Sequence, residues 1–408
     1  MVQNYFQKVI LYWKYDIFMI IKRDLQPIVL NSSTKYPVIT ITGPRQSGKT
    51  TLIRSTFPDY PYLSMEAPDE RERALSDPRG LFSRFGNRLI IDEIQQGPPL
   101  LSYIQDAVDN DRQASFIISG SQNMLMMASI SQSLAGRTSI FYQLPLSLNE
   151  LSGTDWLWND WTQHLWTGFY PRIFDRKLNP AEFYGNYLET YVNRDVRQIK
   201  NIGNLSLFSR FISICAGSIG QTTNYSQLAN LTGVSLQTVL SWLSILEASF
   251  IIYRLEPYHR NFNKRLVKSA KIYFYDTGLA CTLLRIYQQK DLPNYFRMGV
   301  LFENFVINEI IKSYYNQGLR PPVYFWQDNK GHEIDLILDV AGRLVPIEIK
   351  AGKTFGADFF KNLAWFQNTS DVPVAKSIVL YGGDQDWEME YGYLWSWKKL
   401  IQWPLHWD

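Results

Sequence analysis

The 408-residue sequence has little cysteine and little histidine: two cysteines, Cys215 and Cys281, and four histidines. Two cysteines in apolar surroundings give neither a disulfide framework nor a metal-binding spacing. We therefore expect two buried thiols in a reducing compartment. The histidines form no cluster, so the sequence excludes disulfide-stabilised secreted domains and cysteine-based zinc modules.

The sequence also has no uninterrupted apolar run of membrane-spanning length. Residues 10–21 are rich in apolar side chains, but Lys14 and Asp16 interrupt them, and a span requires about 20 residues. No small-residue cleavage site follows. We expect a lead-in helix over residues 1–19 and a cytoplasmic protein without a membrane contact, with Met19 as an alternative translation start.

The excess of positive charge is small, a formal net charge of +3. That value does not indicate nucleic-acid binding by itself, so any DNA-binding surface has to be a local patch. The length suits two to four domains. With 46% hydrophobic residues, the chain can bury full cores.

Short apolar runs alternate with helical stretches in the first third, which predicts an α/β domain with a parallel sheet. The runs at 37–41, 88–91 and 115–118 are solidly apolar, as strands buried on both faces must be. We expect a multidomain α/β protein. Its parts are residues 1–150 (the α/β domain), 151–205 (a helical connector), 206–290 (helices with two β-rich runs) and 291–408 (a helix followed by strands).

A phosphate-binding loop follows the first predicted strand. Residues 43–50 read G-P-R-Q-S-G-K-T, which fits G-x-x-x-x-G-K-[ST] in full, and a helix follows directly. The glycines let backbone N–H groups close around a phosphate, and the helix N-terminus adds positive potential. Lys49 is expected to reach the β- and γ-phosphates of ATP, and the Thr50 hydroxyl to ligate Mg²⁺.

Two acids end the second apolar run, as a P-loop requires of a neighbouring strand. Asp92 is expected to hold Mg²⁺ through water, and Glu93 to act as general base for the attacking water. A glutamate here indicates a hydrolase more than a passive binder, the alternative being two solvated acids. The expected nucleotide-binding residues are Gly43, Pro44, Arg45, Gln46, Ser47, Gly48, Lys49, Thr50, Thr51 and Asp92.

Two later positions are further candidates for catalysis. Ser119 or Ser121, at the end of the third run, would sense the γ-phosphate or position the water; the alternative is a plain loop. Arg137 follows a turn, and would stabilise the transferring phosphate as a finger from its own or a neighbouring subunit. The alternative for Arg137 is an ordinary surface arginine.

Together these motifs resemble a widespread prokaryotic family of AAA-type P-loop ATPases with a C-terminal winged-helix plus restriction-endonuclease-like domain of unknown function. The resemblance covers nearly the whole chain from about residue 20. It implies an AAA-type sheet, a winged helix and a nuclease-like fold, and it favours the finger role of Arg137. The matching stretches are 43–50, 91–95, 119–121, 134–137, 168–171, 191–196 and 273–279.

A winged helix is also predicted by the residues themselves. Residues 225–231 form a short helix, 232–234 a tight turn, and Ser235 caps a second helix. The β-rich runs 250–255 and 271–275 would form the wing. The residues expected to be buried on the second helix are Leu236, Val239, Leu240, Leu243 and Leu246.

Basic residues of the wing would contact DNA phosphates. They are Arg260, Lys264, Arg265, Lys268 and Lys271. Residues 235–248 contain no Arg or Lys, which disfavours base reading. The alternative is a winged helix used for packing or for a protein contact.

The last segment has the D…E-x-K order of restriction-endonuclease-like folds. Asp335 and Glu348, on successive predicted strands, would hold Mg²⁺, and Lys350 would help to activate water. Alternation puts Glu348 and Lys350 on one face, and Glu303 on the preceding helix would complete the metal site. The alternative is such a fold that binds without cleaving. The nearby aromatics Phe325, Trp326, Trp365 and Phe366 are expected in the core.

The sequence thus predicts a protein that hydrolyses ATP with Mg²⁺ and couples hydrolysis to a DNA transaction through its two C-terminal modules. A homo-oligomer is a further expectation. Two alternatives stay open: a regulatory nucleotide switch that binds protein partners without nucleic acid, and an ATP-gated metal-dependent nuclease.

Overall fold

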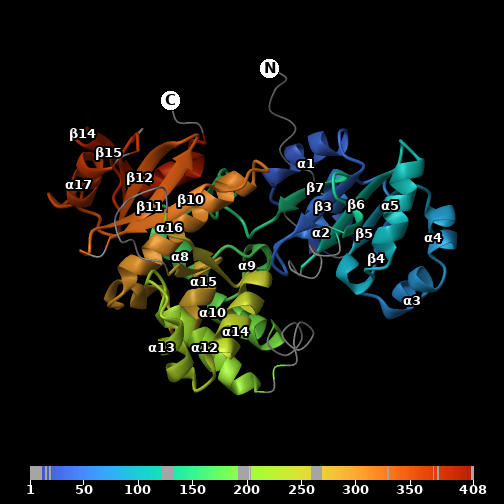
Figure 1. The fold of residues 1–408 in the computed structure, drawn as a ribbon, viewed down its shortest axis with the longest axis horizontal. Coiled ribbons are helices and arrows are strands. Elements are labelled where there is room, and N and C mark those ends of the chain that lie inside the picture. Colours follow the sequence, from blue (N-terminus) through green and yellow to red (C-terminus); the bar gives the residue numbers. More distant parts are fainter. Residues whose placement is uncertain are drawn as a thin grey trace.

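A computed structural model describes most of the chain, which forms two bodies (Figure 1). The α/β domain lies at the right of the view, and a larger body at the left contains a second sheet and most of the helices. The described residues are 12–13, 16–17, 20–121, 130, 132–191, 202, 204–258, 269–328, 330–370, 372–374 and 376–405.

The N-terminal segment corrects one prediction. Tyr12–Trp13 (β1) and Asp16–Ile17 (β2) pair as antiparallel strands. The lead-in helix predicted for residues 1–19 is therefore wrong at these positions. Aromatic and β-branched residues favour the extended conformation, and the strands carry three of them. Most of the segment lies outside the described residues.

The first sheet has five parallel strands in the order β4-β5-β6-β3-β7. The three apolar runs form β3, β5 and β6, as predicted, and one strand separates the P-loop strand β3 from the acidic strand β5. This is the AAA-type sheet that the resemblance implied. The strands are β3 (Val38–Thr42), β4 (Tyr62–Ser64), β5 (Arg88–Asp92), β6 (Ser115–Gly120) and β7 (Thr138–Tyr142).

Helices cover both faces of this sheet, so alternate residues of a strand enter different cores. Ile39 and Ile41 pack with α1 and α2, whereas Val38 packs on the opposite face with α5. Double burial explains why the strands read as unbroken apolar runs. The helices are α1 (Leu25–Ser33), α2 (Lys49–Thr56), α3 (Pro68–Ser76), α4 (Pro78–Phe85), η1 (Ile94–Gln96) and α5 (Leu100–Asn110).

The second sheet is mixed, in the order β10-β11-β12-β13-β15-β14. β12, β13 and β15 are parallel, and the other pairs are antiparallel. A tight turn with positive φ at Ala341 (53°) and Gly342 (83°) joins β11 to β12, as a two-residue hairpin requires. The strands are β10 (Val323–Gln327), β11 (Glu333–Val340), β12 (Arg343–Lys350), β13 (Ile378–Tyr381), β14 (Trp387–Met389) and β15 (Gly392–Ser396).

Helices between the two sheets and on the second sheet complete this body. α16 packs on one face of the second sheet and α17 on the other. The helices of this body outside the helix-turn-helix segment are α7 (Leu148–Leu151), α8 (Trp161–Thr167), α9 (Pro171–Arg176), α10 (Pro180–Tyr191), α12 (Leu205–Gly217), α15 (Thr277–Leu283), η3 (Gln289–Asn294), α16 (Met298–Tyr315), α17 (Lys361–Thr369) and η4 (Trp397–Gln402).

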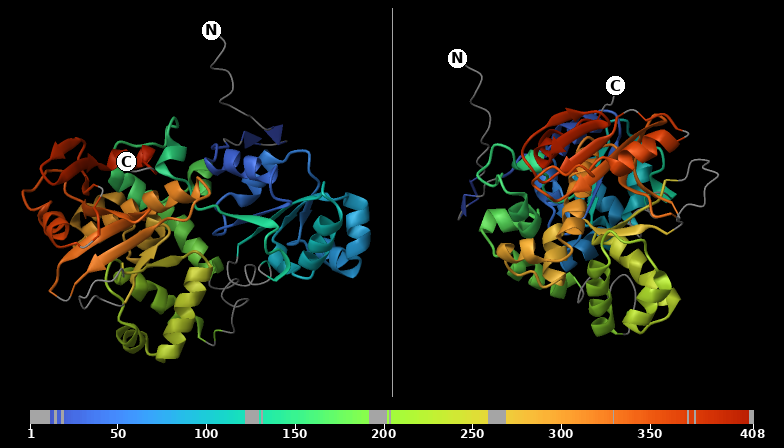
Figure 2. Two further views of the ribbon diagram at one scale, coloured as in Figure 1. Left: turned by 45° about the horizontal axis from the view of Figure 1, so that its top comes forward. Right: turned by 90° about the vertical axis from the view of Figure 1, so that its left-hand side faces the viewer.

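A helix-turn-helix arrangement with a following hairpin lies below the second sheet (Figure 2). α13 (Tyr225–Thr232) and α14 (Leu236–Ala248) are bent by 99° at the turn. The Ser235 side chain caps α14 by accepting from Thr238 N at 3.1 Å. β8 (Ile252–Leu255) and β9 (Lys271–Phe274) pair antiparallel.

The predicted buried face of α14 is partly wrong. Leu236 and Leu240 are 47% and 43% exposed, although Val239, Leu243 and Leu246 are buried. Trp242 and Ile245, which the five-residue pattern omitted, are also buried. Trp242 packs against Phe208 of α12 with ring centroids 5.2 Å apart. The buried face of the helix therefore contains Trp242 and Ile245 and excludes Leu236 and Leu240.

The larger hydrophobic core of this body, distinct from the cluster beneath α17, contains described residues from Leu144 to Trp403. It joins the predicted connector, the helix-turn-helix segment and the C-terminal sheet; for example, Trp161 and Phe302 have ring centroids 4.5 Å apart. Asp276 stabilises this junction because its buried carboxylate accepts from Tyr184 OH (2.6 Å), Phe169 N (2.8 Å) and Gly278 N (2.9 Å). These contacts give the stretches 168–171 and 273–279 a structural role.

The other structural expectations have the following outcomes. Cys215 and Cys281 are free and buried, as predicted, and burial raises the pKa of each thiol. Phe325, Trp326 and Phe366 are buried, and Trp365 is partly buried. In the part of the chain that the structure describes, no single helix is long and apolar enough to cross a membrane, and only the bent pair α13–α14 passes by length and composition.

His164 provides a test of this shared core. The side chain is fully buried and lies on Phe169 with the rings 9° from parallel, and burial lowers the pKa of His164 to about 4. An unfolded histidine has a pKa of about 6.5, so the unfolded state binds the proton first as the pH falls. Stability is therefore full above the unfolded pKa and decreases as the pH falls toward 4.

We predict that lowering the pH from 7.5 to 5 removes about 2 kcal/mol of stability through His164. Urea unfolding of the wild type and of His164→Gln at both pH values measures the difference, and the variant should lose less stability on acidification. Equal losses in the two proteins would contradict this role of His164.

Candidate functional site

The P-loop connects β3 to α2 at the carboxyl edge of the first sheet. Its two glycines adopt backbone angles that other residues rarely adopt, with φ of 151° at Gly43 and 94° at Gly48. A Cβ at position 43 would lie 2.2 Å from the carbonyl oxygen of Gln143. The loop therefore requires glycine at position 43 on steric grounds as well, which explains the first glycine of the motif.

The polar groups of the loop fit a phosphate. Lys49 is 6% exposed, and its Nζ donates to Gly43 O (3.0 Å) and Pro44 O (2.7 Å). The Lys49 ammonium group thus lies against the loop whose bound phosphates it is expected to contact. The Ser47 hydroxyl is buried and has no hydrogen-bond partner among the described residues. A buried unpaired donor is costly, and a phosphate oxygen would satisfy it.

Asp92 gathers three hydroxyl groups from other elements. Its Oδ2 accepts from Thr50 Oγ1 and from Tyr62 OH, both at 2.7 Å, and its Oδ1 accepts from Ser119 Oγ. Burial and the neighbouring Asp92 raise the pKa of Tyr62, so Tyr62 stays a hydrogen donor. The contact of Thr50 with Asp92 is the pairing expected of two groups that share one Mg²⁺ ion.

Glu93 is held in a defined orientation. Its backbone is left-handed, with φ of 56°, a conformation that costs energy in non-glycine residues and is frequent at active sites. Its Oε2 accepts from Ser121 Oγ at 3.3 Å and from Gln95 Nε2. The structure therefore brings Ser121 to Glu93 and Ser119 to Asp92, so both candidate serines contact the acid pair.

The sequence interpretation missed Arg23 and Tyr62. Arg23 is 6% exposed and donates to Ser47 O (2.8 Å), Leu144 O (2.6 Å) and Glu150 Oε1 (2.8 Å). It therefore fixes the P-loop to the start of the second body. The only sequence signal for Arg23 is a charged triplet, Lys22 to Asp24, between apolar residues.

Arg137 lies at the wrong edge of the sheet to act on the nucleotide of its own subunit. Its carbonyl oxygen accepts from Val38 N at the start of β3, whereas the P-loop follows the end of that parallel strand. Five strand residues span about 15 Å. The guanidinium binds Asp109 with two contacts, at 2.6 and 2.8 Å. A finger role within the same subunit is therefore wrong.

The D…E-x-K residues Asp335, Glu348 and Lys350 lie close together on β11 and β12. β11 and β12 pair with Leu336 opposite Ile347, so Asp335 and Glu348 occupy facing positions. Lys350 Nζ contacts Glu348 Oε1 at 2.6 Å, and Asp335 Oδ2 accepts from Ile349 N at 2.7 Å. Burial, and then the charge of Asp335, raise the pKa of Glu348 to about 8.

The metal site expected from Glu303, Asp335 and Glu348 is not assembled. Among the described residues, no group of three or more His, Cys, Asp or Glu side chains lies close enough to hold a metal ion. Glu303 instead accepts from Tyr273 OH, and its Oε1 lies 3.7 Å from Lys271 Nζ. The residues present therefore do not fit a bound metal in this arrangement.

Lys271 also corrects the predicted basic wing. Its side chain is only 1% exposed, so it does not belong to a DNA-facing patch. Carboxylates of the C-terminal domain lie against its ammonium group. The other four predicted wing residues, Arg260, Lys264, Arg265 and Lys268, lie outside the described residues.

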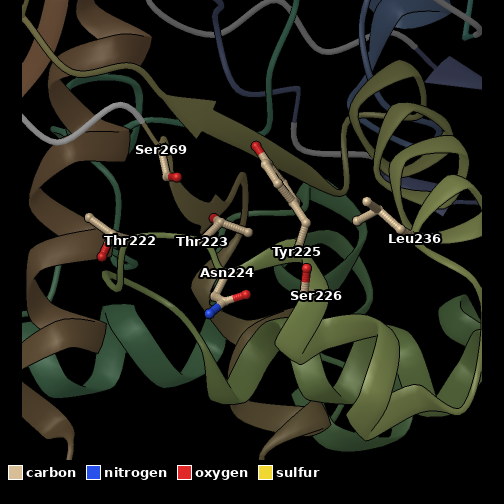
Figure 3. Close-up of a pocket in the computed structure, with 7 residues that line it drawn as sticks. All are labelled: Thr222, Thr223, Asn224, Tyr225, Ser226, Leu236 and Ser269. Carbon is tan, nitrogen blue, oxygen red and sulfur yellow. The ribbon is translucent and has the colours of Figure 1, made fainter.

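A polar pocket lies where the helix-turn-helix segment meets the hairpin (Figure 3). It opens at the N-terminus of α13, and the buried Oγ1 of Thr223 has no partner among the described residues. Among the residues that the structure describes, its lining offers hydroxyl and amide groups but no Lys or Arg. The lining residues are Thr222, Thr223, Asn224, Tyr225, Ser226, Leu236 and Ser269.

Comparison with protein families divides the chain into three parts. Residues 35–152 match an AAA domain. Residues 159–290 match a domain of unknown function (DUF8612), and residues 298–400 match another (DUF4143). The first match covers the sheet, the P-loop and the acid pair described above.

Two relatives whose names assign no function match most of this chain. The proteins Mb2031c of Mycobacterium bovis and Rv2008c of Mycobacterium tuberculosis are each 29% identical to this chain over 373 residues, which is 90% of this chain and 81% of theirs.

Two solved structures are distantly similar. The Walker-type ATPase PABY2304 of Pyrococcus abyssi has 14% identity and a TM-score of 0.43, over 65% of this chain and 96% of that one. The STAND protein with a tetratricopeptide repeat sensor, PH0952 of Pyrococcus horikoshii, has 15% identity and a TM-score of 0.23, over 73% and 47% of the two chains.

The five-stranded parallel sheet, the P-loop geometry and the family match over the same residues identify the first domain. This chain carries an AAA-type P-loop ATPase domain, followed by a C-terminal region that matches domains of unknown function.

Proposed function

We propose that the protein binds ATP with Mg²⁺ and hydrolyses it at the carboxyl edge of the first sheet. The observation that carries this proposal is the 2.7 Å hydrogen bond between Thr50 and Asp92. It brings the hydroxyl of the P-loop and the acid of β5 to one point, where both can serve a single ion. When bound, Mg-ATP supplies the phosphoryl group and a divalent charge.

Residues of this chain would bind the phosphates, accept the proton of water and hold the acidic side chains in position. Backbone N–H groups of the P-loop and the Lys49 ammonium bind and orient the phosphates. Glu93 accepts the proton of the attacking water at its carboxylate. Ser121 and Gln95 donate to that carboxylate and so hold it in position. Ser119 keeps Asp92 aligned from the neighbouring strand.

We propose further that hydrolysis is coupled to a DNA transaction through the C-terminal region. The helix-turn-helix geometry, the hydroxyl-rich pocket at α13 and the basic residues 260–268 support a contact with phosphates. Arg137, which is partly exposed on the far edge of the sheet, is suited to act on a neighbouring subunit of a homo-oligomer. The two buried free thiols fit a reducing cytoplasm.

A nucleotide switch that binds protein partners is the second candidate. The exposed Leu236 and Leu240 on α14 favour it, because exposed apolar side chains on one helix face suit a protein contact better than a nucleic acid. The nuclease alternative has less support, since the described residues do not assemble its metal site.

Removing the Lys49 ammonium should abolish tight ATP binding. We expect Lys49→Ala to raise the dissociation constant for ATP by roughly 100-fold or more, because alanine cannot make the charge-assisted bond to phosphate. Titration with a fluorescent ATP analogue measures the change. Lys35→Ala, at an exposed position just after α1, is the control and should bind normally. Undiminished binding by Lys49→Ala would refute the placement of the phosphates.

Replacing the proposed general base should separate binding from turnover. Glu93→Gln is expected to bind ATP as the wild type does and to hydrolyse it about 10²–10⁴-fold more slowly. Steady-state phosphate release gives kcat, and Glu72→Gln on the exposed side of α3 is the matched control. Normal turnover by Glu93→Gln would remove Glu93 from this role.

Neutralising the wing should weaken DNA binding in a salt-dependent way. For Arg260→Gln, Lys264→Gln and Arg265→Gln combined, we expect a lower affinity and a salt slope that decreases by about 0.9 for each DNA phosphate that the protein no longer neutralises. Fluorescence anisotropy with duplex DNA at several salt concentrations measures both. An affinity and a slope equal to those of the wild type would favour the protein-partner switch.

A further inference from the structure

A lysine from the hairpin β8–β9 is buried among the acids of the C-terminal domain. Lys271, the first residue of β9, has a side chain that is 1% exposed. Its Nζ bonds to Glu333 Oε1, lies 3.7 Å from Glu303 Oε1, and lies 5.1 Å from the centre of the Phe325 ring. Two carboxylates and an aromatic face therefore surround one ammonium group.

The hairpin is attached to the C-terminal sheet in a way that fixes this lysine. Beyond β8, Phe325 N of β10 donates to Glu256 O at 3.1 Å, and Tyr258 N donates to Phe325 O at 2.7 Å. These bonds extend the C-terminal sheet by one short segment from the preceding domain. As a consequence, Lys271 can leave the acidic site only if the hairpin separates from β10 or its side chain rearranges.

The acidic site contains one carboxyl oxygen without a hydrogen-bond partner among the described residues. Glu348 is 3% exposed, and its Oε1 contacts Lys350 Nζ (2.6 Å) and accepts from Asn362 Nδ2 (3.3 Å). Its Oε2 is buried and has no hydrogen-bond partner among the described residues. A buried carboxyl oxygen without a partner is costly unless the group retains a proton or meets a cation.

The charges of this region are unequal. Lys271 and Lys350 face four carboxylates, which belong to Glu303, Glu333, Asp335 and Glu348. Four carboxyl groups so close together are stable only when they share cations or retain protons. However, the described residues form no group that could hold a metal ion, and Glu303, the third expected ligand, is paired with Lys271.

We propose that the Lys271 ammonium is a built-in cation of the C-terminal acidic site, and that it excludes a divalent metal ion while the hairpin β8–β9 lies on the C-terminal sheet. The metal site then consists of Asp335, Glu348 and Glu303, and it forms only when Lys271 is withdrawn. The order D…E-x-K alone does not reveal this arrangement, because the competing cation comes from the preceding domain.

Metal binding without nucleotide tests the proposal. Mn²⁺ is titrated into the full chain, and electron paramagnetic resonance measures how much of it is bound. Every protein in the series carries Asp92→Asn, so that the nucleotide site does not contribute. With Lys271 intact, we expect no Mn²⁺ site that depends on Glu348. Lys271→Met, which keeps the length of the side chain but removes its charge, should gain one Mn²⁺ site with at least 10-fold higher affinity. That site should disappear in Lys271→Met with Glu348→Gln.

Two controls separate charge from packing. Lys271→Arg retains the charge and should stay without the metal site, and Lys330→Met, at an exposed lysine before β11, should behave as the parent does. If Lys271→Met does not fold, Lys271→Gln takes its place, and circular dichroism together with ATP binding identifies the folded variants.

Either of two results would overturn the proposal. One is Mn²⁺ binding by the protein with Lys271 intact that Glu348→Gln abolishes, a measurement that needs no Lys271 variant. The other is a folded, uncharged Lys271 variant that binds no additional Mn²⁺.

Discussion

Asp92 stands at the end of β5, and its two carboxylate oxygens accept hydrogen bonds from side chains on α2, β4 and β6. These elements lie far apart in the sequence, and the parallel sheet brings the three side chains together at the end of β5. A buried carboxylate is stable only with such partners. The same bonds fix the position of Thr50, the proposed ligand of Mg²⁺, and the next residue, Glu93, accepts from Ser121. The geometry of the proposed ATPase centre therefore depends on how this one acid is satisfied.

A second set of buried charges connects this centre to the rest of the chain. Arg23 binds both the P-loop and Glu150. The segment after β7, which contains Glu150, contacts α16, because Leu148 N donates to Glu309 Oε2 at 2.7 Å. Lys312 on the same helix donates to Leu146 O at 2.8 Å and lies 3.7 Å from the centre of the Phe169 ring. These polar contacts connect the P-loop to the body that carries the helix-turn-helix segment and the second sheet. A change in the P-loop on nucleotide binding can therefore be transmitted to that body.

Features that depend on neighbouring residues could be predicted from the sequence. The P-loop is a continuous motif, and β3, β5 and β6 are recognisable because strands buried on both faces are apolar throughout. The opposition of Asp335 and Glu348 follows from strand alternation and a two-residue hairpin. By contrast, Arg23 and Tyr62 act through partners 24 to 127 positions away, and no local pattern identifies such contacts. The run of charges before β9 suggests a solvated wing that includes Lys271, whereas the tertiary fold buries this lysine. The position of Arg137 depends on strand direction relative to the P-loop, which the motif does not contain.

The most direct test of the central claim is phosphate release from Mg-ATP by the purified protein, compared between the wild type and Asp92→Asn, with ATP binding measured for both. The account predicts Mg²⁺-dependent turnover by the wild type and its loss in the variant, while the variant still binds ATP. A wild-type protein that binds ATP and releases no phosphate, with or without DNA, would contradict hydrolysis at this site and leave a passive nucleotide switch.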